Sequence, residues 1–194
     1  MTFHEILGAA AIITGLYGYV PYVRGMMKVE VHPHMFSWFI WGLITWIAFA
    51  AQVSDGAGAG SWIMCVTGVF CLGIAAVAFK SGERDITRSD WGFFGLSLAA
   101  IPLWVMTNNP LWSVILISLI DVLAMMPTVR KSWSRPWSES IEAYAVAGLK
   151  FMLSIFALEN ISLVTALYPA VVVGVNALFC AMLVVRRRGI ARPA

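Results

Sequence analysis

Charged side chains are scarce in this sequence. Only 12% of its 194 residues are Asp, Glu, Lys or Arg, whereas 60% are hydrophobic, and the mean hydropathy is +0.83. A water-soluble domain of this length does not need so much apolar surface. The composition therefore excludes an ordinary soluble domain and indicates an integral membrane protein.

Paired cysteines and common catalytic motifs are also lacking. Cys65, Cys71 and Cys180 fall inside apolar segments at spacings that fit neither a CxxC pair nor a metal site, so we expect buried free thiols. The sequence has no HExxH motif, no phosphate-binding loop and no serine–histidine–acid set. We therefore predict no catalytic residue, no metal and no cofactor, and we do not expect an enzyme.

The apolar residues form seven runs, each of about the length that a membrane-spanning helix needs. Gly56–Gly60 separates the second run from the third, and Pro110 opens the fifth. The sequence predicts an all-α transmembrane fold with helices near residues 5–25, 34–53, 59–80, 90–108, 111–130, 139–158 and 161–185.

The basic residues are distributed unevenly between the loops. With seven spans, twelve of the thirteen Lys and Arg residues fall on one side, and Lys150 falls within a span. The other side carries Glu5, Asp55 and Glu159. By the positive-inside rule, the amino terminus is outside and the carboxyl terminus is in the cytoplasm of a multi-pass inner (plasma) membrane protein.

An internal repeat relates the two halves of the chain. Pro21-Tyr22-Val23-Arg24 returns 106 positions later as Pro127-Thr128-Val129-Arg130, and the same shift pairs Gly42 with Gly148. The sequence thus predicts a 3+1+3 arrangement within one membrane domain. Residues 1–82 and 110–194 form parallel three-helix repeats, and residues 83–109 form the linker helix that keeps them parallel.

This arrangement resembles the SWEET, SemiSWEET and PQ-loop superfamily. Pro21 and Pro127 match the proline of that family's Pro-Gln motif, although Tyr22 and Thr128 replace the glutamine. The resemblance covers nearly the whole chain. It implies a solute site between the halves and transport by alternating access.

The same resemblance implies which residues line the solute site. Gly42 and Trp46 match a glycine and a substrate-facing tryptophan of the family's second helix, and Met152 follows Gly148 in the second repeat. Val66 and Val172 replace the asparagines of sugar-transporting members. The implied cavity is more apolar than a sugar site, so we expect an aromatic or amphipathic solute.

Four prolines lie within the predicted helices. A proline removes one backbone hydrogen bond and bends a helix, which makes it either a static kink or a hinge. For Pro102 and Pro169 we favour a static kink. For Pro21 and Pro127, which repeat and match the family, we favour a hinge.

Asp121 and Lys150 lie near the middle of predicted spans, where charges are costly and face protein or water. They could form a proton relay, a substrate anchor or a structural ion pair. We favour a functional role for Asp121. Lys150 is two residues from both Gly148 and Met152, which turns it away from the expected cavity, so we favour a structural role for it. Asn176 lies inside the last helix, where interhelical hydrogen bonding is favoured over ligand contact.

The expected function is transport of a small solute across the lipid bilayer. The alternatives are a ligand-binding receptor or sorting protein on the same fold, as the KDEL-receptor branch suggests, and a membrane enzyme that uses Asp121. The basic tail Arg186–Arg188 is too short for a nucleic-acid-binding arm, so no nucleic acid is expected. Association into a homo-oligomer is left open.

Overall fold

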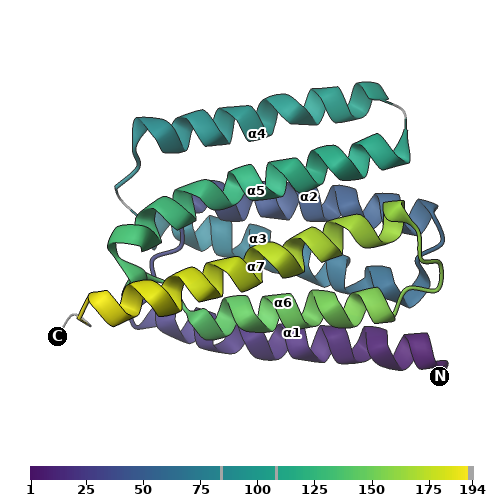
Figure 1. The fold of residues 1–194 in the computed structure, drawn as a ribbon, viewed down its shortest axis with the longest axis horizontal. Coiled ribbons are helices and arrows are strands. Elements are labelled where there is room, and N and C mark those ends of the chain that lie inside the picture. The colour runs from purple at the N-terminus through teal and green to yellow at the C-terminus, as the bar shows by residue number, and fades with distance from the viewer. Residues whose placement is uncertain (84, 108, 192–194) are drawn as a thin grey trace.

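The computed structural model describes residues 1–83, 85–107 and 109–191, which form helices and no strand. Seven α-helices follow one another in the chain, and two short 3-10 helices lie in the connections (Figure 1). Their bounds are α1 Phe3–Met27, α2 Met35–Ser54, η1 Gly58–Ser61, α3 Trp62–Ser81, α4 Arg88–Thr107, α5 Pro110–Ser134, η2 Pro136–Ser138, α6 Ile141–Phe156 and α7 Leu163–Gly189.

The seven helices predicted from the sequence are confirmed, with differences at their ends. Polar caps set several boundaries: Ser162 forms a capping box at the start of α7, and Asn109 caps α5 with Pro110 in the first turn. The sixth helix is shorter than the predicted 139–158, because Ser140 caps its start and it ends at Phe156. Residue 108, the predicted end of the fourth helix, lies outside the described residues.

The helices pack side by side, with α4 at one edge of the molecule against α5 (Figure 1). The main contacts of α1 are with α6, and α2 packs on both α3 and α5, while α7 contacts α5 and α6. Glycines permit the closest approaches. A Cβ atom on Gly18 would come within 2.5 Å of Val146 in α6, and one on Gly42 within 2.5 Å of Leu72 in α3.

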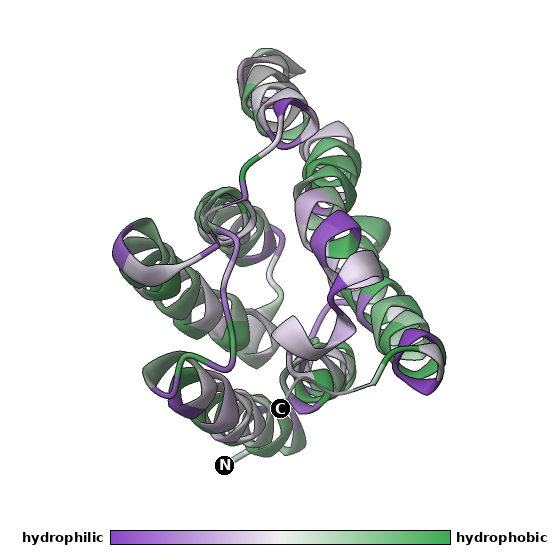
Figure 2. Ribbon diagram, turned by 90° about the vertical axis from the view of Figure 1, so that its left-hand side faces the viewer, coloured by the Kyte–Doolittle hydropathy of each residue, from purple (hydrophilic) through white to green (hydrophobic). Residues whose placement is uncertain are grey.

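Among the residues that the structure describes, five helical segments are long and apolar enough to cross a membrane: Phe3–Met27, Met35–Ser54, Gly58–Ser81, Leu111–Ser134 and Leu163–Gly189. The α6 helix has only 16 residues. The hydrophilic residues gather at helix ends and in connections, whereas the helix bodies are largely hydrophobic (Figure 2). The two termini lie at opposite ends of the bundle (Figure 1). The structure is thus that of a helical membrane protein.

The beginning of α4 is fixed by polar and aromatic contacts. Asp90 accepts two hydrogen bonds from Arg130 of α5, at 2.9 and 2.7 Å, and a third from the backbone N–H of Thr87. The ring of Phe36 in α2 stacks on Phe94 of α4, with centroids 4.2 Å apart. The repeated arginine therefore has a packing role in the second half of the chain, whereas its counterpart Arg24 is exposed.

Candidate functional site

A central cavity lies between the two halves of the chain. Its volume is about 80 Å³, several times the roughly 10–15 Å³ that one ordered water needs. Of the side chains that the structure describes, those that line it come from α1, α2, α3, α5, α6 and α7. The lining residues are Gly15, Gly18, Tyr19, Tyr22, Trp38, Trp41, Thr45, Thr67, Cys71, Asp121, Met125, Ala143, Tyr144, Val146, Ala147, Lys150, Phe151, Val172, Val175 and Asn176.

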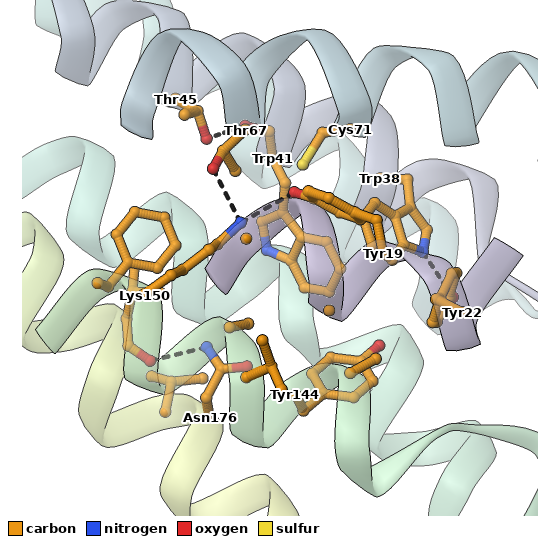
Figure 3. A pocket seen from close by; sticks show the side chains of 18 of the residues that line it. Tyr19, Tyr22, Trp38, Trp41, Thr45, Thr67, Cys71, Tyr144, Lys150 and Asn176 are labelled. Atoms are coloured by element: carbon orange, nitrogen blue, oxygen red, sulfur yellow. Dashed lines mark hydrogen bonds between the residues drawn. The ribbon is translucent and has the colours of Figure 1, made fainter. Parts of the chain in front are cut away.

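Lys150 reaches into the central cavity, contrary to the orientation expected from the sequence (Figure 3). Its ammonium group donates hydrogen bonds to the hydroxyls of Tyr19, at 3.0 Å, and Thr67, at 2.9 Å. It also lies 4.6 Å from the centroid of the Tyr19 ring. The expectation failed because α6 turns Gly148 toward α7, where a Cβ atom would lie 3.6 Å from Asn176, and thereby turns Lys150 toward the cavity.

Asp121 lines the same cavity from α5. Its carboxylate accepts a hydrogen bond from the hydroxyl of Tyr168 at 3.4 Å, and the Tyr168 hydroxyl lies 3.4 Å from that of Thr45. Within the described residues, no ion pair joins Asp121 to Lys150. The cavity wall therefore carries one positive and one negative group that are not paired with each other.

Two other predicted site residues lie in the cavity wall. Val172 and Asn176 are one turn apart in α7, and the amide nitrogen of Asn176 donates to the carbonyl oxygen of Val172 at 2.8 Å (Figure 3). This bond lies within one helix, so it does not provide the interhelical contact favoured from the sequence. The amide side chain is instead held at the cavity surface.

Trp46, Met152 and Val66, which were expected to line the solute site, are not among the residues that line the central cavity. Trp46 is 38% exposed and Met152 is 43% exposed. Trp46 covers Gly68 of α3, where a Cβ atom would lie 2.8 Å from the indole nitrogen. The cavity face of α2 consists of Trp38, Trp41 and Thr45, and Trp46 lies about 100° further around the helix.

Several cavity residues were not identified from the sequence. Thr67 and Tyr144 are single polar residues in apolar runs, which carry little signal on their own. Trp38 also lines the cavity, and its indole N–H donates to the hydroxyl of Tyr22 at 3.0 Å. The spacing of Trp38, Trp41 and Thr45 by three and four positions was the available signal, because such residues share one helix face.

A buried polar cluster lies at one end of the cavity, next to the lining residues Tyr22 and Tyr144. Lys131 of α5 forms an ion pair with Glu139, and both side chains are fully buried. The hydroxyls of Tyr22 and Tyr144 lie 3.4 and 3.3 Å from the same carboxylate. Because Tyr22 belongs to α1 and the other three residues to the second half of the chain, this cluster joins the two halves.

The residues directly after the two repeated prolines make comparable contacts. Tyr22 follows Pro21 and hydrogen-bonds to Glu139. Thr128 follows Pro127, and its hydroxyl donates to Ser37 of α2 at 3.1 Å. Each contact joins the first helix of one half to a residue at or near the second helix of the other. Both repeated motifs therefore lie where the two halves meet.

A second set of contacts between the halves lies beyond the opposite end of the cavity. The amide of Gln52, in α2, donates to the carbonyl oxygen of Thr165, in α7, at 2.8 Å. Ser162 donates to the Asp55 carboxylate at 2.8 Å. Polar contacts between the halves thus lie at or beyond both ends of the cavity.

His34, which precedes the first residue of α2, is fully buried. Its Nε2 atom lies 3.6 Å from a carboxylate oxygen of Asp90. Burial lowers the pKa of His34 from its ordinary value of 6.5; Asp90 opposes this effect, and Lys131 and Arg130 add to it. Among the described residues, no three His, Cys, Asp or Glu side chains form a potential metal site.

Comparisons with known proteins give no relative. No family model, no curated protein and no solved structure matches this chain.

Proposed function

We propose that this protein is a membrane transporter that moves a small solute by alternating access between two three-helix bundles. The bundles are α1–α3 and α5–α7, and α4 joins them, as in SWEET-like proteins. The helix contacts support this proposal. The repeat relates α1 to α5 and α2 to α6, so the packing of α1 on α6 corresponds to the packing of α2 on α5. Parallel repeats are expected to meet in this way.

One observation carries the transport proposal: the central cavity is lined by both halves of the chain, and polar contacts join the halves beyond each of its ends. The Tyr22–Glu139 and Thr128–Ser37 contacts lie toward one end, and the Gln52–Thr165 contact lies at the other. Alternating access breaks one set of contacts while the other holds. Weak, reversible hydrogen bonds suit such a cycle because each one stabilises a closed end only modestly.

Pro21 and Pro127 are the hinges of the proposed cycle. Each lies inside a continuous helix, α1 or α5. A proline cannot donate a hydrogen bond to the carbonyl four residues earlier, which leaves the carbonyls of Tyr17 and Leu123 without that bond. A helix that lacks one backbone hydrogen bond bends at a lower cost in free energy. Both prolines lie next to the contacts between the halves that must break during the cycle.

The proposed location is the inner (plasma) membrane, with the amino terminus outside and the carboxyl terminus in the cytoplasm. The end of the bundle that holds the carboxyl terminus also holds the last turns of α1, α3 and α5, which carry Arg24, Lys80 and Lys131 (Figure 1). Such an excess of Lys and Arg marks the cytoplasmic side. The end near Tyr22 and Glu139 is accordingly the cytoplasmic one.

Flux measurements test the transport proposal. Purified protein in liposomes is expected to take up a small aromatic or amphipathic solute, and Pro21→Ala and Pro127→Ala are each expected to slow uptake at least about tenfold while the protein stays folded. Pro102→Ala is the matched control, because this exposed proline lies in α4 and does not line the cavity. Equal uptake by all three variants would contradict the hinge role of Pro21 and Pro127. Saturable binding without any flux would favour a receptor over a transporter.

A further inference from the structure

Two buried charges of opposite sign face the central cavity. Lys150 is 3% exposed and Asp121 is 5% exposed. Within the described part of the chain, neither has an ion-pair partner within 4 Å. A charge in such surroundings is costly unless an opposite charge compensates it. The protein itself does not supply that compensation here.

Both groups also retain unused hydrogen-bonding capacity. An ammonium group has three donors, and Lys150 directs two of them to Tyr19 and Thr67. An ionised carboxylate accepts about four hydrogen bonds, and Asp121 accepts one long bond from Tyr168. Among the described contacts, Lys150 thus keeps one donor and Asp121 about three acceptor sites that a polar ligand could use.

We propose that the central cavity binds a small zwitterion, such as a neutral amino acid. Lys150 binds its anionic group and Asp121 binds its cationic group. A ligand with a single charge would compensate one of these side chains and leave the other buried and unpaired. Only a solute that carries both charges compensates both without changing the net charge of the site.

The rest of the cavity wall fits an apolar solute body. Trp41, Tyr144 and Phe151 line it together with Val172 and Val175. Aromatic and aliphatic side chains gain free energy by covering apolar surface. The expected ligand is therefore a zwitterion with an uncharged, largely apolar side chain. This inference rests on the proposed transport site, since it assigns the class of solute that the site takes.

Binding is tested first, separately from transport. Neutral α-amino acids from glycine to tryptophan are titrated by calorimetry into the full-length protein in lipid nanodiscs. The tightest binder is then compared with its decarboxylated amine and its deaminated acid. For phenylalanine these are 2-phenylethylamine and 3-phenylpropionate. The amine and the acid are each expected to bind at least about tenfold more weakly than the amino acid.

Two variants separate the contributions of the charges. Lys150→Met removes the ammonium group, so it is expected to weaken binding of the amino acid and the acid at least about tenfold while sparing the amine. Asp121→Asn is expected to weaken binding of the amino acid and of the amine, and to leave binding of the acid unchanged. The retained binding of one probe shows that each variant is folded. Lys28→Met and Asp85→Asn, at exposed positions, serve as controls.

The outcomes distinguish this inference from the transport proposal. If the acid or the amine binds as tightly as the amino acid, or if no amino acid binds the folded protein, the zwitterion site is overturned. If an amino acid binds with the expected selectivity but is not taken up into liposomes, the site stands and the transport proposal fails. If a solute is taken up without this charge selectivity, the transport proposal stands and the zwitterion site is overturned.

Discussion

The hydroxyl of Tyr22 lies 3.4 Å from a carboxylate oxygen of Glu139, across the boundary between the two halves of the chain. Tyr22 directly follows the first repeated proline, and it also accepts a hydrogen bond from the indole of Trp38. Its counterpart Thr128 contacts Ser37 across the same boundary. The positions where the resemblance expects glutamine thus carry hydroxyl groups that link the halves.

Replacing Tyr22 by phenylalanine removes this link and keeps the ring. The indole N–H of Trp38 and the carboxylate of Glu139 each lose a partner, so the free energy of unfolding is expected to fall by about 1–3 kcal/mol. Equilibrium unfolding in detergent micelles measures the change. Tyr17→Phe is the matched control, because Tyr17 lies on the same helix and is 71% exposed. An equal loss in the control would contradict a specific role for the Tyr22 hydroxyl.

The buried pair of Lys131 and Glu139 is expected to be sensitive to the loss of one partner. Lys131→Met leaves a buried carboxylate without its cation and is expected to lower the free energy of unfolding by about 3–5 kcal/mol. Adding Glu139→Gln to that variant is expected to restore part of the loss. A double-mutant cycle measures the coupling. Lys28→Met, which removes a lysine at an exposed position, is expected to cost under about 1 kcal/mol.

Acid is expected to destabilise the protein through His34. Its pKa in the folded state is below the ordinary 6.5 because of burial, so the unfolded chain binds a proton more readily. The stabilisation is fully present above about pH 6.5 and is lost as the pH falls through the folded-state pKa. Unfolding measured between about pH 5 and 8 is expected to show a smaller pH dependence in His34→Gln than in the wild type. The same flattening in His32→Gln would contradict this assignment.

Gly42 is expected to tolerate no side chain, for reasons of packing. A Cβ atom there would lie within 2.6 Å of two side-chain carbons of Leu72 in α3, so Gly42→Ala is expected to reduce the free energy of unfolding by about 1–3 kcal/mol. Gly174→Ala is the control, since nothing lies within 4 Å of its added Cβ. An alanine there is expected to be neutral or to stabilise the helix by up to about 1 kcal/mol. Equal effects on unfolding at the two sites would rule out the packing argument.

The helices could be predicted from the sequence, because long apolar runs separated by Gly, Pro, Asn and charged residues define them. Pro110 with Asn109 begins α5 near the predicted position, whereas α7 continues past its predicted end through Arg186–Arg188. The site could be predicted only in part: Asp121, Val172 and Asn176 line the central cavity, whereas Trp46 and Met152 do not.

The sequence by itself determined the number of helices, their order and the end of the bundle where the basic residues lie. Only the tertiary structure decided which face of each helix borders the cavity. In a soluble protein the polar face of a helix reveals its orientation, but these helices are apolar on nearly all sides because lipid replaces water around them. The close approach of Gly18 in α1 to Val146 in α6 constrains the packing of α6, and in this packing Lys150 lines the cavity.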